Sequence, residues 1–250
     1  MLIRSDKPPL APGVASDGVA VRATQIVKEF GSGETRVRVL HGVDVEILAG
    51  QMTFIVGPSG CGKTTLISVI AGILSAEGGE VDVFGTRVTS LGQRQLAEFR
   101  ARTIGFIFQQ FNLLPALTAA ENASVPLLVN GASEAEATRK ARELLSAVGL
   151  AAHADKFPSE LSGGQQQRVA IARALVHEPR LVISEEPTAS LDAHAGQTAM
   201  QLLRDRAVRP DRAVIVVTHD NRIFKFADRI IRMSDGRVTG VEQAPFKEAA

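Results

Sequence analysis

The chain has 250 residues, of which 45% are hydrophobic and 22% charged, a balance typical of a globular domain rather than a disordered or fibrous chain. Its 28 lysines and arginines and 27 aspartates and glutamates leave a formal charge of only +1. Bulk electrostatic attraction therefore cannot hold nucleic acid or anionic lipid. The single cysteine, Cys61, excludes an internal disulfide and a multi-cysteine metal cluster and is typical of a reducing compartment.

The length predicts one large domain or one domain with an inserted subdomain. The longest apolar stretches, such as residues 66–74, fall far short of the roughly 18–20 residues that span a bilayer. Residues 1–18 contain Asp, Lys and prolines where a signal peptide carries an apolar block, so we expect them to form a flexible lead.

Residues 19–30 and 37–48 alternate loosely between apolar and polar positions, and the glycines between them predict a turn and an early antiparallel sheet. An apolar run at 52–56 then enters the sequence GPSGCGKTT. The segment after this sequence has helical length and ends near Gly72. The predicted order is strand, glycine-rich loop and helix.

This loop satisfies the pattern G-x-x-x-x-G-K-[ST], because Gly57 is followed after four residues by Gly62, Lys63 and Thr64. In such a loop the backbone amides and the helix N-terminus converge on phosphate oxygens, the lysine reaches the terminal phosphates, and the hydroxyl ligates Mg²⁺. A glycine-rich turn without a ligand is the alternative, and it would leave Lys63 and Thr64 without a purpose. The pattern by itself does not choose among kinase, GTPase, helicase and transporter ATPase.

An apolar run at 103–108 leads into residues 109–129. These residues are too irregular for a regular strand and too apolar for a solvent-exposed loop without a binding role. A partner surface is one explanation. Residues 133–150 predict a helix that begins with a capping box of Ser133 and Glu136. The apolar positions of this helix are Ala137, Ala141, Leu144, Leu145 and Val148. We expect an inserted helical subdomain in this region.

The sequence LSGGQ at 161–165 predicts a second helix end that is suited to an anion. Ser162 and Gln165 have the spacing of a capping box. The apolar face of the helix that follows comprises Val169, Ala172 and Val176. Taken alone, the segment is more simply a well-capped helix with flexible glycines.

Two further segments are apolar on both faces, as in a parallel sheet covered by helices. They are residues 181–184 and 213–217. In such sheets, ligands bind at the carboxyl ends of the strands. The first strand delivers Glu185 and Glu186, of which one can hold Mg²⁺ through water and the other can polarise an attacking water. The second delivers Thr218 and His219, and the simpler alternatives are a solvated acidic pair and an ordinary loop histidine.

From about residue 19 to residue 236 the chain resembles the ATP-binding cassette (ABC) ATPases. GPSGCGKTT is similar to their Walker A loop, FIFQQ to the Q-loop, LSGGQ to the family signature, LVISEEPT to Walker B, SLD to the D-loop and His219 to the switch histidine. The resemblance implies ATP contacts by Phe30, Gly57, Pro58, Ser59, Gly60, Cys61, Gly62, Lys63, Thr64 and Thr65. It implies that the signature contacts ATP held by a second copy, through Leu161, Ser162, Gly163, Gly164 and Gln165. The D-loop residues are Ser190, Leu191 and Asp192.

The resemblance also implies catalytic roles for Glu186, His219 and Gln109, with Gln110 as the lesser candidate for the Q-loop sensor. Mg²⁺ would be held by Thr64, Gln109 and, through water, Glu185. Glu185 stands where the family usually has an aspartate, and its extra methylene either shifts the water shell of Mg²⁺ and slows hydrolysis or bends to fit. Phe30 stands where an aromatic, commonly tyrosine, stacks on adenine, and a core phenylalanine is the alternative.

The fold implied by the resemblance is α/β: a P-loop NTPase core of the RecA type with a mostly parallel sheet, an N-terminal antiparallel β subdomain and an inserted α-helical subdomain. A single ATPase domain would cover residues 19–240, with the helical subdomain at about 106–178. Residues 241–250 would form a C-terminal tail.

The segments GETRVRVLHGV and FQQFNLLPALTAAENASVPL are most similar to the stand-alone subunits of lipoprotein-releasing and macrolide-export-type transporters. Amino-acid importers share part of this pattern. The resemblance implies an ATP-hydrolysing subunit that dimerises with a second copy on ATP. It would drive an integral-membrane permease docked near Phe111–Leu127, in the cytoplasm at the membrane surface, with no nucleic-acid partner. The alternatives are a soluble ABC ATPase acting on nucleic acid or ribosomes, and a regulatory module whose hydrolysis Glu185 has impaired.

Overall fold

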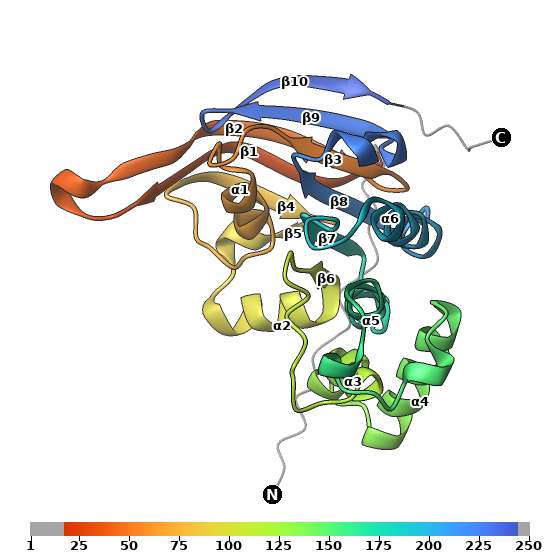
Figure 1. Cartoon of the computed structure of the whole chain (residues 1–250). Helices are drawn as coiled ribbons and strands as arrows, with labels where there is room; N and C mark the ends of the chain where they lie inside the picture. The colour runs from red at the N-terminus through yellow and green to blue at the C-terminus, as the bar shows by residue number, and fades with distance from the viewer. Residues whose placement is uncertain (1–17, 245–250) are drawn as a thin grey trace, which may run out of the picture.

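The structure is a computed structural model that describes residues 18–244, with only the backbone for Glu34. Two β-sheets and the helices packed around them make up this part of the chain (Figure 1). Except for Gly18, the expected lead at 1–18 lies outside the described residues, as does the end of the expected tail from residue 245. No helix among the described residues is both long enough and apolar enough to cross a membrane.

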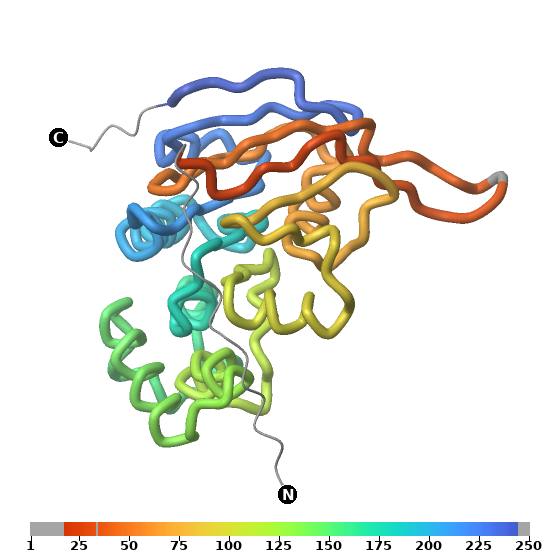
Figure 2. Tube along the Cα trace, turned by 180° about the vertical axis from the view of Figure 1, so that it is seen from behind, coloured from red at the N-terminus to blue at the C-terminus, as the bar shows by residue number. Residues whose placement is uncertain are grey.

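The first sheet is antiparallel, with the strand order β2-β1-β4-β5. Its strands are β1 (Val19–Phe30), β2 (Val37–Leu48), β4 (Gly78–Val83) and β5 (Thr86–Arg87). β1 and β2 have the predicted bounds, and they pair from Val19 opposite Leu48 to Phe30 opposite Val37. Their far end, which carries the short helix η1 (Gly33–Thr35), projects from the body as a long hairpin, as both Figure 1 and Figure 2 show. The prediction of an early antiparallel sheet is confirmed.

The second sheet has the order β10-β9-β3-β8-β7-β6, and every neighbouring pair is parallel except β10 with β9. Its strands are β3 (Met52–Val56), β6 (Ile104–Ile107), β7 (Leu181–Glu185), β8 (Ala213–Thr218), β9 (Arg229–Ser234) and β10 (Arg237–Gln243). The predicted mostly parallel sheet is therefore confirmed. β10 continues past the expected domain boundary at residue 240, because residues 241–243 pair with β9.

Both faces of the parallel sheet are covered, which explains the unbroken apolar runs of its strands. The helices that cover them are α1 (Lys63–Ile70), α5 (Gly163–Leu175) and α6 (Ala193–Ala207). On one face, Ile55 and Ile215 join α1 and the antiparallel sheet in a common core. On the other face, Phe54 and Val216 pack among residues of α5 and α6.

A separate helical lobe lies beside α5, away from the sheets (Figure 1). It contains α3 (Ala119–Val129) and α4 (Glu134–Ala147) and has a core of its own. α5 joins the lobe to the sheet, because Val169 and Ala172 face the lobe whereas Ala170 and Ile171 face the sheet. The lobe falls within the range 106–178 expected for a helical subdomain.

The helix predicted at 133–150 is α4, but its expected capping box is only half formed. The Ser133 hydroxyl accepts a hydrogen bond from the backbone N–H of Glu136 at 3.3 Å. The Glu136 carboxylate instead pairs with Lys140 at 3.0 Å, one turn along the helix. An ion pair with a lysine four residues away is the stronger attraction for this exposed carboxylate.

Residues 109–129 are irregular only in their first part, and α3 is a helix that the sequence pattern did not predict. The buried side chain of Asn122 holds the irregular part in place. Its Nδ2 donates to the carbonyl oxygens of Leu114, Leu117 and Thr118, at 2.9–3.0 Å. Its Oδ1 accepts from the backbone N–H of Leu114 at 2.7 Å. The remaining helices are α2 (Gln93–Thr103), η2 (Val88–Ser90), η3 (Ala151–His153), η4 (Pro158–Glu160) and η5 (Asn221–Phe226).

Candidate active site

The predicted phosphate loop and the polar strand ends line one cavity of about 280 Å³. It lies at the carboxyl edge of the parallel sheet, where β3, β7 and β8 end. The predicted residues that line it are Ser59, Gly60, Gly62, Lys63, Thr64, Thr65, Gln109, Glu185, Glu186 and His219. Val39 and Val217, which the sequence did not single out, complete the wall. Segments far apart in the sequence therefore meet at this edge, as expected for an α/β sheet.

Two positions of the loop require glycine, because a Cβ atom there would clash with a neighbouring strand. A Cβ atom on Gly57 would lie 2.1 Å from the carbonyl oxygen of Met233 in β9. Gly62 has a φ of +100°, and a Cβ there would lie 2.9 Å from Leu40 Cδ2 in β2. The loop is thus packed tightly beneath two strands, and α1 begins directly after it with its N–H groups facing the cavity edge.

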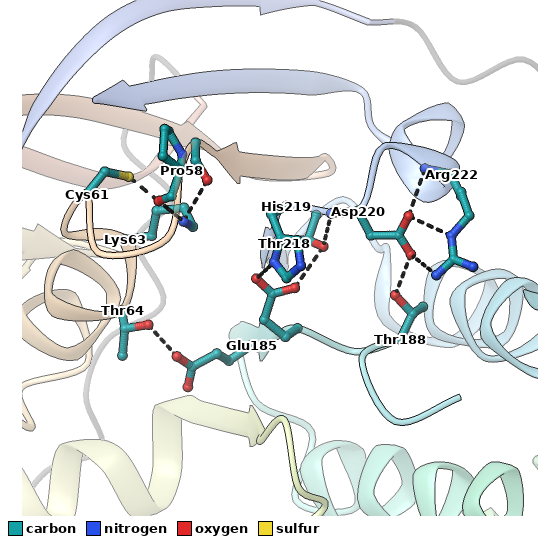
Figure 3. Close-up of polar contacts among 12 residues, drawn as sticks. Pro58, Cys61, Lys63, Thr64, Glu185, Thr188, Thr218, His219, Asp220 and Arg222 are labelled. Carbon is teal, nitrogen blue, oxygen red and sulfur yellow. Dashed lines mark hydrogen bonds and ion pairs between the residues drawn. The ribbon is translucent and has the colours of Figure 1, made fainter. Parts of the chain in front are cut away.

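The ammonium of Lys63 is folded into its own loop, and the residue is only 7% exposed. Its Nζ donates to the carbonyl oxygens of Gly57 and Pro58, both at 2.8 Å, and lies 3.8 Å from Cys61 Sγ (Figure 3). The residues that contact this ammonium do not line the cavity but stabilise the conformation of the loop. They are Gly57, Pro58 and Cys61. A phosphate oxygen would be a stronger acceptor than these carbonyls, because its hydrogen bond to the ammonium is between opposite charges.

Thr64 and Glu185 connect the start of α1 with the end of β7. The Thr64 hydroxyl donates directly to a carboxylate oxygen of Glu185 (Figure 3). Gln109 also lines the cavity, whereas its neighbour Gln110 does not, so Gln109 is the better placed Q-loop candidate. A hydroxyl, a carboxylate and an amide are the oxygen donors that Mg²⁺ prefers when it is bound mainly through phosphates and water, so these residues fit the ion. In the described part of the chain, no group of three or more His, Cys, Asp or Glu forms a metal cage.

Glu186 is fixed by both its backbone and its side chain. Its φ is +45°, and its N–H donates to the carbonyl oxygen of Val217 in β8 at 2.8 Å. Its Oε2 accepts from the hydroxyl of Thr218 at 3.0 Å, and its Oε1 lies 2.7 Å from Nδ1 of His219. Because a carboxylate can only accept, Nδ1 of His219 carries the proton in this contact. The side chain of Glu186 is 13% exposed and that of His219 67% exposed, so the carboxylate is shielded while the imidazole reaches outward.

A second set of contacts, absent from the sequence analysis, centres on Asp220. Its carboxylate accepts from the Thr188 hydroxyl at 3.0 Å and from the Arg222 guanidinium at 2.8 Å (Figure 3). The hydrogen bond from Arg222 is the main cause that lowers the pKa of Asp220 to about 2. The backbone N–H of Asp220 also donates to the Thr218 hydroxyl at 3.0 Å. Asp220 thus ties the loop after β7 to the segment after β8, which carries His219.

The signature and D-loop residues line a different cavity, of about 340 Å³, that shares no residue with the first. Ser162 and Gln165 form the predicted capping box, with bonds of 3.3 and 2.9 Å. Asp192 caps α6 by accepting from the N–H of Ala195 at 2.9 Å, and this hydrogen bond lowers the pKa of Asp192. The predicted residues that line this cavity are Ser162, Gly163, Gly164, Ser190, Leu191 and Asp192. Two helix N-termini therefore open onto it.

Besides Gly57, Pro58 and Cys61, three further predicted residues line neither cavity. Leu161 is buried, and Gln165 is turned toward His153 at 3.1 Å. Phe30 is 43% exposed at the end of β1, with Nζ of Lys28 at 5.3 Å from the centre of its ring. The wall of the first cavity on that side is formed by Val39 of β2 instead.

The comparisons with known proteins agree with this arrangement of motifs. The family model described as ABC transporter matches residues 40–189, which is more than half of the chain. The chain belongs to the ABC transporter family. As a family member it carries the ATPase cassette, and membership implies ATP binding and hydrolysis, for which Mg²⁺ is generally required.

Three relatives of this ABC cassette show how much of it is shared. The lipoprotein-releasing system ATP-binding protein LolD of Bacteroides fragilis (strain YCH46) is 42% identical over 213 residues, which are 85% of this chain and 97% of that protein. The macrolide export ATP-binding/permease protein MacB of Brucella melitensis biotype 1 is 42% identical over 87% of this chain but only 34% of its own length. The dimeric structure of the ATP-binding cassette MJ0796 bound to ADP and Pi matches with a TM-score of 0.82 and 38% identity, over 90% of this chain and 98% of that one. The predicted P-loop NTPase fold is thereby confirmed.

Proposed function

We propose that this chain binds and hydrolyses ATP between two copies of itself and so drives a separate integral-membrane permease, in export or lipoprotein release. One observation carries the proposal: the phosphate-loop cavity and the signature cavity lie on the same chain but share no residue. A second copy, related by a twofold axis, would bring each loop opposite a signature and complete two equal sites. The cassette MJ0796, which is 38% identical, was solved as a dimer.

In this composite site the two copies would hold opposite sides of the triphosphate. The loop amides and Lys63 would bind the β- and γ-phosphates, and the N-terminus of α5 behind Ser162 would add its N–H groups from the partner copy. Thr64, Gln109 and Glu185 would hold Mg²⁺, which when bound neutralises charge that develops on the phosphates. ATP thereby joins the two copies, and its hydrolysis releases them.

Glu186 is the group best placed to take the proton of an attacking water. Thr218 and His219 hold its carboxylate at the cavity wall, so the orientation exists before substrate binds. As the water oxygen attacks the γ-phosphorus, its proton passes to Glu186 while the bond to the β-phosphate oxygen breaks. His219, whose Nδ1 faces Glu186, would donate from Nε2 to the γ-phosphate when both of its ring nitrogens carry a proton.

Glu185 would limit the rate of this reaction. Its side chain is one methylene longer than aspartate, and here it reaches the Thr64 hydroxyl directly. Both groups are expected Mg²⁺ ligands, and Mg²⁺ tolerates little departure from octahedral geometry. Their direct contact would therefore have to open before both could serve the ion and its water shell.

The surface near Phe111–Leu127 would receive a cytoplasmic helix of the permease, which places the chain at the cytoplasmic face of the membrane. A groove of about 220 Å³ lies beside this segment and is lined in part by Phe106, Val125 and Pro126. The neighbouring Val129 is 67% exposed, and exposed apolar groups around a groove are typical of a helix-docking surface. Arg173, which also lines the groove, donates to the carbonyl of Phe111 at 2.6 Å and so connects it with the Q-loop.

ATP hydrolysis by the purified chain, with and without the Glu186→Gln substitution, tests the proposal. The wild type should hydrolyse Mg²⁺-ATP, and the variant should lose roughly 10²–10⁴-fold in kcat, the usual contribution of a positioned acid or base, while it still binds ATP. Glu98→Gln is the matched control, because Glu98 is an exposed glutamate on α2 that pairs with Arg94. A Glu186→Gln variant with the parental rate would remove Glu186 from the proposed role.

A further inference from the structure

A further cavity of the cassette lies at the opposite edge of the parallel sheet from the phosphate loop. It has a volume of about 530 Å³ and is enclosed by α4, the ends of α5 and α6, and the segments that precede β7 and β8. It shares no residue with either cavity of the ATPase site. A cavity of this size lies within the range of small-molecule binding sites.

Both basic and apolar side chains line this cavity. Lys140, Arg206, Arg209 and Arg212 line it, against the two carboxylates of Glu143 and Glu178. The excess is two positive charges, on a chain whose whole formal charge is +1. The apolar residues that line it are Leu127, Leu144, Ala147, Leu175 and Val176.

The two carboxylates that line the cavity form no ion pair with Arg206 or Arg212. Glu143 pairs with Arg139 at 2.6 Å, and Glu178 lies 4.0 Å from Arg209. Within residues 18–244, neither Arg206 nor Arg212 has a carboxylate within ion-pair distance.

Both arginines donate instead to backbone carbonyl oxygens. Arg206 donates to Ala147 at 2.9 Å, and Nε of Arg212 donates to Pro179 at 2.6 Å. Nη1 of Arg212 makes two longer contacts, at 3.3 and 3.5 Å, with the carbonyls that end α6. Its Nη2 has no acceptor in the described part of the chain. A guanidinium has five N–H donors, so each arginine keeps donors for a ligand.

Arg212 is only 4% exposed, and a buried cation without a directly paired carboxylate is unfavourable. Burial is the main cause that lowers the pKa of its guanidinium, and the charge of Arg209 acts in the same direction, while the charges of Asp211 and Glu178 oppose them. An anion in the cavity would relieve both effects. Planar guanidinium groups match the oxygens of phosphate especially well.

We propose that this cavity binds a phosphate group attached to a short apolar chain, with the phosphate against Arg206, Arg209 and Arg212 and the chain against the leucines. Such a group occurs in anionic lipids and in soluble alkyl phosphates. Because α4 belongs to the helical lobe and Arg209 and Arg212 to the sheet-bearing core, a bound molecule would also link the two parts. The proposal is independent of the proposed function at the phosphate loop.

Titration calorimetry with octyl phosphate, below its micelle concentration, tests the proposal on the full chain. We expect saturable binding of one molecule, and about ten- to a hundredfold weaker binding by Arg209→Ala, since a charge-assisted hydrogen bond is lost. Arg209 is suited to the test because its side chain is half exposed and its one ion pair within residues 18–244 is the 4.0 Å contact with Glu178. Arg94→Ala is the matched control, an exposed arginine on α2 that pairs with Glu98.

Two further probes test whether the phosphate is needed for binding and whether the phosphate belongs to a lipid or to a soluble ester. Octyl glucoside, which lacks the charge, should bind far more weakly than octyl phosphate, and equal binding would overturn the proposal. So would the absence of saturable octyl phosphate binding, or an unchanged affinity in Arg209→Ala. Sedimentation with phosphatidylglycerol-containing vesicles, lost in Arg209→Ala, would assign the phosphate to a lipid. Binding of octyl phosphate without vesicle binding would assign it to a soluble ester.

Discussion

Glu185 and Glu186 are neighbours in sequence, yet their surroundings divide them into two roles. Glu185 ends β7 and reaches the Thr64 hydroxyl at the start of α1. Glu186 has a left-handed backbone and turns to Thr218 and His219 at the end of β8. One carboxylate therefore faces the expected metal and the other the expected water. This division depends on the left-handed backbone at Glu186, which cannot be predicted from two adjacent glutamates in the sequence.

The Glu185→Asp substitution should raise kcat for ATP hydrolysis. Aspartate is one methylene shorter, so it would release the Thr64 hydroxyl and leave room for the water shell of Mg²⁺. A misplacement of about 1 Å costs on the order of a hundredfold in rate, so we expect a gain of roughly tenfold. Steady-state hydrolysis at saturating Mg²⁺-ATP measures it. An unchanged or lower kcat would show that the site already accommodates the longer side chain.

Many of the site residues were predictable because their chemistry requires a fixed local pattern. The glycine loop with Lys63 and Thr64 is one such pattern, and the polar ends of buried strands are another. Asp220 was not predicted, because its role comes from contacts with Thr188, 32 residues away, and with Arg222. The position of Phe30 outside the cavity also depends on the path of a hairpin, which residue type does not determine.

At the level of elements, α4 and α5 begin in the same way but lie in different surroundings. Each has a serine N-cap whose hydroxyl accepts an N–H bond at 3.3 Å, Ser133 on α4 and Ser162 on α5. Only Ser162 lines the signature cavity. A comparison of Ser133 with Ser162 therefore distinguishes the capping role of a serine from the proposed role in binding ATP across the dimer.

Ser133→Ala and Ser162→Ala should each lower the free energy of unfolding by about 1 kcal/mol, because an N-cap hydrogen bond is lost. Only Ser162→Ala should also weaken ATP-dependent association and hydrolysis. Denaturant unfolding and ATPase assays on both variants measure these effects. If the two variants had equal activity, the signature serine would be no more than a cap.

Asp220 joins the loop after β7, which contains Thr188, to the segment after β8, and this link should depend on pH. Its pKa in the folded chain is about 2, against 3.8 as the ordinary value. The folded state thus favours the charged form, so the stabilisation is present above about pH 4 and is lost as the pH falls toward 2. Because Arg222 is half exposed, we expect only about 1–2 kcal/mol.

Unfolding measured from pH 7 to pH 2 on the wild type and Asp220→Asn checks this link. The variant should be less stable at pH 7, and the difference should shrink below pH 4. Asp205→Asn is the control, since the carboxylate of Asp205 accepts from the amide of Gln201 rather than from an arginine. A difference that stays constant across this range would contradict the ionic link.

The elements that the sequence predicted are those whose apolar pattern is simple. β3, β7 and β8 are buried on both faces, so their runs are unbroken. α3 was missed because Pro126 lies inside it, although Thr118 and Glu121 form a capping box that signals its start. β4 begins with two glycines, and β9 carries exposed charged residues among apolar ones; neither pattern marks a strand without its neighbours.

For the whole molecule, the decisive feature is that the phosphate-loop cavity and the signature cavity lie on one chain and share no residue. The phosphate loop is attached to the sheet core, whereas the signature begins α5, which connects the core with the helical lobe. A movement of the lobe would therefore move the signature and, with it, the groove expected to receive the permease. ATP binding between two copies would couple both surfaces.

The most direct test of this account is the mass of the Glu186→Gln variant in solution, measured by sedimentation velocity with Mg²⁺-ATP and, as a control, with Mg²⁺-ADP. With hydrolysis suppressed, ATP should convert the variant to a species of twice the monomer mass, and the added Ser162→Ala substitution should weaken that conversion. A variant that binds Mg²⁺-ATP yet stays monomeric at high concentration, even beside its permease, would contradict the composite site.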